Sequence, residues 1–340
     1  MSLEPIQWLL ERMAEQAFAS FRSWESFAAA LRTVPGLFVD FTHGFAWPYL
    51  LSSLLLAWCI FVTARLKGDP AVSFREFAFP GRLYRHPSAT LDFRFVAVDI
   101  LLYALLYVPI LTGINLLAIK AIGAALSGVA AWEPPRTWTP VGAVGAAFLF
   151  LLLHDFISYC AHALYHHVPA LWAFHEVHHS AEVLTPATAY RVHPVELIGV
   201  AILNAPVIGL AAWLYQNLAG PPVQLATVFG LSIIGLLGGH LRHSHILFSF
   251  GPTVSRIVLS PAQHVIHHST DPAHWNKNLG IKFAIWDYLF GTLYVPKPGE
   301  TVRVGLPDMG RQKFSSVPGL YLLPFARAMA GIPGGRRRGA

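Results

Sequence analysis

Charged residues are scarce in this sequence. Asp, Glu, Lys and Arg make up 12% of its 340 residues, about half of the roughly 25% that soluble globular proteins carry. Hydrophobic residues make up 54%. This balance excludes a disordered chain, a collagen-like chain and an ordinary soluble enzyme.

Cysteine is almost absent. The two cysteines, Cys59 and Cys160, lie in or beside apolar runs. They are too few for a disulfide framework, a cysteine-based zinc finger or a four-cysteine iron–sulfur site, and we expect both to be small buried hydrophobic residues. The sequence also has no GxGxxG motif after a strand, so no built-in flavin or nicotinamide domain is expected.

Basic residues outnumber acidic ones, and the formal net charge is +6. There is no basic and aromatic stripe in a soluble domain, so no nucleic-acid partner is expected. Residues 64–94, 159–194 and 242–340 hold 19 of the 24 Lys and Arg residues. Because cytoplasmic loops retain basic residues, these three segments are predicted to be cytoplasmic.

Long apolar runs are frequent. A helix needs about 20 apolar residues to cross a bilayer, and five stretches approach that length. The fourth and fifth are predicted to form a hairpin that turns at 216–222, and Pro109 is a possible kink in the second. The chain is therefore predicted to be an all-α, polytopic transmembrane bundle with spans at 45–62, 95–119, 141–158, 197–215 and 223–241.

The predicted organisation has four parts. Residues 1–44 show no signal-peptide pattern, and they carry acidic residues among aromatics, which favours an amphipathic, interfacial segment. Residues 45–140 form an N-terminal transmembrane region with a basic cytoplasmic loop. Residues 141–295 form a histidine-rich domain whose helical cap is cytoplasmic, and residues 296–340 form a basic tail.

Histidine is unusually common, and 15 of the 17 histidines lie between His154 and His274. Three clusters stand out: His162-x-x-x-His166, His175-x-x-His178-His179 and His264-x-x-His267-His268. Residues three and four apart share a helix face, so each cluster is predicted to point its imidazoles one way. Pro169 and the Ser260-Pro261-x-Gln263 capping box predict the starts of the second and third helices.

So many imidazoles crowded together indicate metal binding. One zinc ion takes at most four ligands, so this number of histidines implies two metals. Asp155, Glu176, Glu196, Asp271 and Asp287 are interpreted as hydrogen-bond partners that orient the ligands, although Glu196 and Asp287 could be structural only. His154, His193 and His245 are assigned supporting roles, and His274 a loop position. The predicted metal ligands are His162, His166, His175, His178, His179, His240, His243, His264, His267 and His268.

Other interpretations stay open at this point. Residues 175–179 also read HExxH, the motif of zinc metalloproteases, with Glu176 as the general base. An intramembrane zinc protease would leave the third cluster unexplained. A metal transporter would need paired polar residues deep in several spans, where Asp99, Asn115 and Asn204 are the obvious candidates. A structural or sensor protein would bind metal without turnover.

The three clusters together resemble the fatty acid hydroxylase/sterol desaturase superfamily of membrane di-iron oxygenases. The similarity covers about 154–293, with HDFISYCAHALYHH at 154–167, AFHEVHHSAE at 173–182, SPAQHVIHHS at 260–269 and NKNLGIKFAIWDYLFGTL at 276–293. One departure is Cys160-Ala161-His162-Ala163, where the family usually shows Trp-x-His-Arg. The missing arginine removes a supporting contact and leaves the ligand set unchanged.

The resemblance implies that the eight histidines of the three clusters are iron ligands, with His240 and His243 in a further ligand-bearing segment. It implies two iron ions, O₂ as cosubstrate, and hydroxylation or desaturation of a membrane lipid, which could be sterol-like, fatty acyl, alkylglycerol, carotenoid or aminolipid. Electrons would come from a separate reductase or electron-transfer protein, because no donor domain is visible in the sequence.

Overall fold

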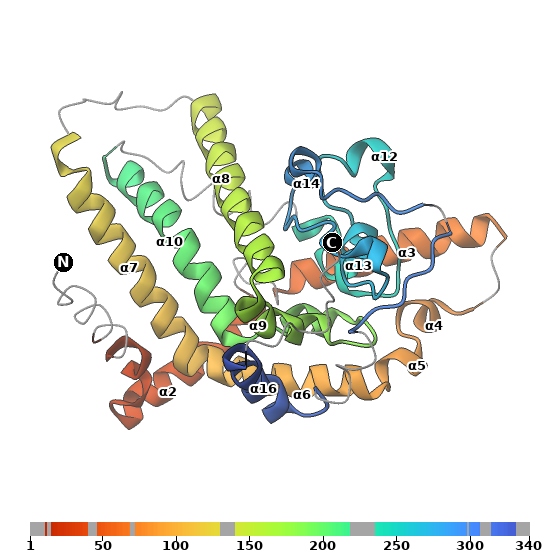
Figure 1. The fold of residues 1–340 in the computed structure, drawn as a ribbon, viewed down its shortest axis with the longest axis horizontal. Helices are drawn as coiled ribbons and strands as arrows, with labels where there is room; N and C mark the ends of the chain where they lie inside the picture. The colour runs from red at the N-terminus through yellow and green to blue at the C-terminus, as the bar shows by residue number, and fades with distance from the viewer. Residues whose placement is uncertain are drawn as a thin grey trace. The chain divides into compact units, whose positions relative to one another are not determined.

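The structure is a computed structural model (Figure 1). It describes residues 11, 15–39, 46–68, 72–129, 140–217, 235–297, 299–306 and 314–330. Over these residues the secondary structure is helical, without strands, and two isolated β-bridges join Val258 to Phe283 and Ser269 to Val304. The predicted all-α fold is confirmed.

The chain divides into two compact units. Unit 1 comprises Met1–Ala46, Val98–Ile157 and Leu197–Ile233, and unit 2 comprises Trp47–Ala97, Ser158–Glu196 and Ile234–Ala340. All three histidine clusters fall in unit 2, because its segments Ser158–Glu196 and Ile234–Ala340 contain them. The site is therefore described within unit 2.

Four described helices are long and apolar enough to cross a membrane. They agree with the first four predicted spans, and the second is much longer than predicted. The fifth predicted span and the turn at 216–222 lie mostly outside the described residues. The four helices are Trp47–Leu66 (α3), Pro87–Ala125, Phe148–His167 within α8 (Pro140–His167), and Pro194–Leu214 within α10 (Pro194–Asn217).

The 39-residue helix contains a local irregularity. It is made of α6 (Pro87–Leu102), a π-helical turn η3 (Tyr103–Tyr107) and α7 (Val108–Ala125). Pro109 has no N–H and cannot bond back to the carbonyl of Leu105, so the preceding turn must adopt another hydrogen-bond pattern. The irregularity lies where the sequence places a possible kink.

In unit 1, the short helix α2 (Trp24–Arg32) begins at Ser23, whose side chain accepts a hydrogen bond from the N–H of Ser26 at 3.0 Å. Trp24 is 80% exposed, which suits an interfacial helix; that role remains a prediction. Helices α7 and α10 approach closely, because a Cβ on Gly209 would lie 2.7 Å from the carbonyl oxygen of Ala118.

One prediction about cysteine is wrong. Cys59, in α3, is exposed, and Cys160 is partly buried. Neighbouring apolar residues of α3, including Leu55 and Trp58, are also about half exposed. An apolar residue in a membrane-spanning helix can face lipid instead of a protein core, so hydrophobicity alone does not predict burial there.

Unit 2 carries the shorter helices that surround the histidines. Helix α9 (Pro169–His179) starts with Pro169 in its first turn, as predicted. Helix α13 (Pro261–His267) has the predicted capping box, since the N–H of Ser260 donates to Gln263 Oε1 at 2.9 Å. The other helices of this unit are α4 (Phe74–Ala78), α5 (Gly81–Tyr84), α12 (Gly251–Val254), α14 (Ile285–Phe290) and α16 (Val317–Met329).

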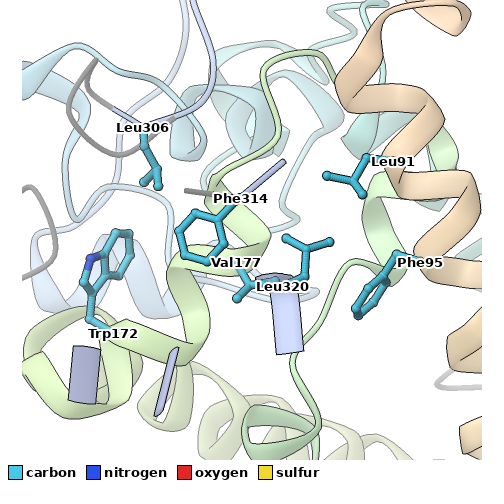
Figure 2. Close-up of a cluster of buried hydrophobic side chains, with 7 residues drawn as sticks. All are labelled: Leu91, Phe95, Trp172, Val177, Leu306, Phe314 and Leu320. Atoms are coloured by element: carbon cyan, nitrogen blue, oxygen red, sulfur yellow. The ribbon is translucent and has the colours of Figure 1, made fainter. Parts of the chain in front are cut away.

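A hydrophobic cluster packs α9 against α16 and the start of α6 (Figure 2). Val177 of α9 and Leu320 of α16 are fully buried, and Phe95 of α6 stacks on Tyr321 with ring centroids 4.8 Å apart. Through Trp172, whose ring lies 5.3 Å from that of His179, this packing reaches the histidines of α9. The cluster consists of Leu91, Phe95, Trp172, Val177, Leu306, Phe314 and Leu320.

Candidate metal centre

Nine of the ten predicted ligand histidines gather in two buried groups. In each group, one nitrogen from every ring lies within 4.8 Å of the others. We call them the first group and the second group. The first group is His162, His166, His175, His179 and His267, and the second group is His178, His243, His264 and His268.

Both HxxHH motifs divide between the two groups. In α9, His175 and His179 belong to the first group and His178 to the second. The last motif is the reverse: His264 and His268 belong to the second group and His267 to the first. The i and i+4 residues of each helix thus serve one group, and the i+3 residue serves the other. We predicted that the histidines of each motif point the same way. The structure shows instead that each HxxHH motif contributes to both groups.

The two groups are in contact. The rings of His179 and His268 stack with centroids 4.5 Å apart, and those of His267 and His268 lie 5.5 Å apart. Two ions held by these groups would therefore be close neighbours. This arrangement suits chemistry in which two metals act on one small molecule.

Three first-group rings are oriented by hydrogen bonds at Nδ1. His162 Nδ1 lies 2.7 Å from the carbonyl oxygen of Leu279, and His175 Nδ1 lies 2.7 Å from Glu196 Oε1. His267 Nδ1 lies 2.9 Å from the carbonyl oxygen of Lys277. Carbonyl and carboxylate oxygens only accept, so each Nδ1 donates and each Nε2 keeps its lone pair.

These lone pairs face one another. His162 Nε2 and His175 Nε2 are 3.0 Å apart, and neither carries a proton when the ring is neutral. His267 Nε2 is buried without a hydrogen-bond partner among the described residues. Lone pairs brought this close in a buried site repel unless a cation lies between them. The arrangement therefore fits a metal ion.

The second group has the same convergence. His264 Nε2 is 2.9 Å from His243 Nε2, and His243 Nε2 is 3.1 Å from His178 Nε2. The Nδ1 atoms of these three rings are buried with no hydrogen-bond partner in the described part of the chain. The orientation of these three rings therefore depends on side-chain packing and on a metal ion bound at Nε2.

Burial keeps these imidazoles neutral. Desolvation, together with the smaller effect of the nearby His175, lowers the pKa of His178 from 6.5 to about 3. Burial and neighbouring histidines also lower the pKa of His179, His264 and His268. Neutral imidazole is the form that binds metal ions, so the groups are prepared to bind metal at neutral pH.

Asp287 supports His162 through the backbone. This fully buried carboxylate accepts hydrogen bonds from the N–H of Leu279 at 2.7 Å and of Gly280 at 2.9 Å. It also accepts from the hydroxyl of Thr292 at 2.6 Å. Since the carbonyl of Leu279 holds His162, Asp287 acts on the ring indirectly. The sequence left two roles open for Asp287, a direct partner of a histidine or a structural residue. These hydrogen bonds give it a structural role.

The C-terminal end of α9 is fixed by a buried arginine that the sequence analysis did not single out. Arg191 Nε donates to the carbonyl of Val177 at 3.0 Å, and its Nη1 pairs with Asp92 at 2.8 Å. Arg191 is 1% exposed and Asp92 fully buried. Its Nη2 also donates to Ser180 Oγ at 2.6 Å. Asp92 precedes the predicted span 95–119 and lies in a segment predicted to be a cytoplasmic loop, so its position in the sequence did not indicate a buried partner.

Glu176, predicted as a hydrogen-bond partner of a histidine, has a cationic partner in the structure. It forms an ion pair with Arg327 of α16, with Nη1 and Oε1 2.7 Å apart and the glutamate side chain 1% exposed. Arg327 also lies over the ring of Phe314, at 5.7 Å. Glu176 is thus a connection between α9 and α16. Arg327 was missed because its partner is 151 positions away in sequence.

The remaining predicted residues have other surroundings. His240 belongs to neither group, and its ring lies 6.1 Å from that of Tyr190. His193 accepts from the N–H of Val195 and contacts the carbonyl of Tyr321, which makes it structural. His154 belongs to neither group.

The other predicted residues have structural contacts. His245 contacts the carbonyl of Phe77, and His274 contacts Ser269 and Glu300. Asp271 caps the turn Pro272–His274.

Comparison with known proteins adds independent evidence. Residues 147–292 match the family model described as fatty acid hydroxylase. The chain is 33% identical to the ornithine lipid hydroxylase OlsE of Rhizobium tropici over 159 residues, which is 46% of this chain and 44% of that protein. It is 25% identical to the alkylglycerol monooxygenase of Caenorhabditis elegans over 175 residues, 52% of this chain and 30% of that protein.

A further relative is named for a different reaction. The chain is 27% identical over 162 residues to the very-long-chain aldehyde decarbonylase GL1-1 of Oryza sativa subsp. indica, covering 46% of this chain and 25% of that protein. No solved structure matches the chain. The chain spans less than half the length of each of these relatives.

The matched segment contains all nine histidines of the two groups. The resemblance stated from the three histidine clusters is therefore confirmed: residues 147–292 match the fatty acid hydroxylase family, and the relatives support the same superfamily.

Proposed function

We propose that the protein is a membrane-bound di-iron oxidoreductase that uses O₂ to hydroxylate or desaturate a membrane lipid. The observation that carries this proposal is the pair of adjoining buried groups, in which imidazole nitrogens converge and, in the first group, the converging Nε2 atoms are the unprotonated ones. The named activities of the relatives, lipid hydroxylase and monooxygenase, support the same reaction class.

The residues fit two ions with histidine ligands. The first group offers five nitrogens, more than the four of a closed zinc site, and the second group offers four. Imidazole suits iron, and histidine-rich sites without thiolates do not favour softer metals. We assign the nine histidines as ligands and leave His240 as a predicted ligand that the two groups do not include. Bound iron would supply the reduction of O₂, which no side chain can perform.

The chain itself orients and shields the centre. Glu196 and the carbonyls of Leu279 and Lys277 each fix the tautomer of one ring, so that Nε2 faces inward. The nine histidines are at most 8% exposed, which keeps bulk water from the centre. Because a lipid C–H bond is unreactive, side reactions with water would compete with its oxidation at the metals. Shielding the centre from water is therefore part of the function.

The alternative, an intramembrane zinc protease, is not favoured. In that mechanism Glu176 must act as a general base on metal-bound water. Here its carboxylate is neutralised by Arg327 at 2.7 Å and is 1% exposed. In addition, His175 and His179 share their group with three further histidines, which leaves no simple three-ligand site.

The proposal includes partners and orientation. The substrate is a lipid taken from the bilayer, and electrons come from a separate reductase or electron-transfer protein. The histidine clusters and the C-terminus are proposed to lie on the cytoplasmic side, because 19 of the 24 Lys and Arg residues lie in the segments assigned to that side.

The test uses lipid mass spectrometry of cells that express the protein under ¹⁸O₂. A hydroxylase adds one labelled oxygen atom to a lipid, and a desaturase removes two hydrogen atoms. The change should vanish in His267→Ala and persist in His167→Ala, whose ring is exposed and bonds to the carbonyl of Ala163. A lipid change that survives His267→Ala, or no lipid change in wild type with a complete electron donor, would contradict the proposal.

A further inference from the structure

An apolar patch lies on the surface of unit 2. Tyr288, Leu289 and Phe290 end α14 and are 58%, 62% and 58% exposed. Val254 and Ile257 are 48% and 54% exposed. We call these five residues the α14 patch. Consecutive large apolar side chains are rarely left in water, so the patch indicates a contact surface.

Backbone hydrogen bonds bring the two parts of the patch together. The N–H of Ala284 donates to the carbonyl of Ile257 at 2.9 Å, and the N–H of Leu259 donates to the carbonyl of Lys282 at 3.0 Å. Helix α14 begins at the next residue, Ile285, and α12 ends at Val254. The two helices lie close together in Figure 1.

The patch adjoins a helix that is long and apolar enough to cross the membrane. The ring of Phe290 stacks on that of Tyr159 in α8, with centroids 5.5 Å apart and planes at 22°. The hydroxyls of Tyr159 and Thr292 lie 3.2 Å apart. Tyr159 belongs to the candidate span Phe148–His167, so the patch lies against the C-terminal half of a helix that could cross the membrane.

Two basic residues adjoin the patch. Lys277 Nζ donates to the carbonyl of Gly291 at 3.2 Å, beside Phe290, and the exposed Arg256 precedes Ile257. The acidic residues of 251–293 are Asp271 and Asp287, and Asp287 is fully buried. Aromatic and aliphatic side chains beside lysine and arginine match the chemistry of a membrane interface with anionic headgroups.

We propose that the α14 patch inserts into the headgroup region of the bilayer that the long helices cross, with Lys277 and Arg256 against anionic phosphates. The same helix carries Asp287, which holds the backbone of Leu279 and so the ring of His162. The lipid contact and the first group thus share one short structural element. The docking is independent of the reaction that the centre catalyses.

The test is photocrosslinking of the full chain in nanodiscs of phosphatidylcholine and phosphatidylglycerol. Benzoylphenylalanine replaces Leu289, and in the control it replaces the exposed Thr301 of the same unit. Since burying one leucine-sized side chain favours the apolar phase by more than a factor of ten, we expect about tenfold more lipid adduct at 289 than at 301. Thermal unfolding verifies that both variants fold.

Two results would overturn the proposal. Equal lipid adduct at both positions would mean that the patch has no preference for lipid, and a dominant adduct with a second copy or another protein would make it a protein interface. A second experiment tests the role of the two basic residues. Replacing Lys277 and Arg256 with Gln should lower the lipid-adduct yield at 289 by about fivefold per residue in phosphatidylglycerol nanodiscs. An unchanged yield contradicts the role of charge.

Discussion

The ion pair between Glu176 and Arg327 provides a sharp test of how α16 supports the histidine-bearing helix. Arg327→Met removes the cation and leaves a carboxylate that is 1% exposed without its charge partner. Breaking a buried pair in this way costs about 3–5 kcal/mol. Methionine keeps the apolar volume that packs near Phe314, so the loss is mainly electrostatic. We expect the free energy of unfolding to fall by that amount.

Thermal unfolding of the detergent-solubilised protein, followed by tryptophan fluorescence, measures the effect. The apparent melting temperature should fall on the order of 5–15 °C, and metal content should fall with it because α9 carries three of the nine histidines. The double variant Glu176→Gln/Arg327→Met removes the buried charge and should regain at least about half of the loss. Arg256→Met, at an exposed position, should stay within about 0.5 kcal/mol of wild type.

The reasoning is refuted if Arg327→Met is as stable as Arg256→Met, or if the double variant is no more stable than the single one. Either result would mean that the carboxylate of Glu176 is solvated or partnered differently in the protein. The connection between α16 and α9 would then rest on the apolar contacts alone.

Further predictions concern the ligand supports and pH. Asp287→Asn places an amide NH₂ against backbone N–H donors and should weaken metal binding about 10–100-fold, as measured by chelator competition. Glu196→Gln should weaken it over a similar range, about 10–100-fold, because Glu196 orients His175; unchanged affinity in either variant would remove that support. In the metal-free protein, burial lowers the pKa of His178 from 6.5 to about 3, so the folded form stays neutral where the unfolded form takes up a proton. Stability should be constant above pH 7 and fall below about pH 6.5, by up to about 1.4 kcal/mol per pH unit for each such histidine; a flat urea-denaturation profile from pH 7 to 5 would contradict this.

The sequence predicted the parts of the site that depend on local spacing. The proline at the start of α9 and the capping box of α13 are local features, and both are confirmed. Helix spacing also identified the histidines that converge, because nine of the ten lie in the two groups.

Other features depend on contacts between distant segments and were missed. The pairs Arg191–Asp92 and Arg327–Glu176 join residues 99 and 151 positions apart. The division of each motif between two groups follows from where α13 and α9 meet, which spacing along one helix does not encode. Likewise His240 and His243 lie together in the 3₁₀-helix Gly239–His243, and of the two only His243 belongs to a group.

The metal content of the purified protein tests the central claim most directly. Elemental analysis combined with iron-edge X-ray absorption should find about two iron ions per chain with imidazole scattering, as two adjoining histidine groups require. Loss of the iron in His267→Ala and its retention in His167→Ala would assign it to these groups. A single zinc ion per chain, or iron that survives His267→Ala unchanged, would contradict the account.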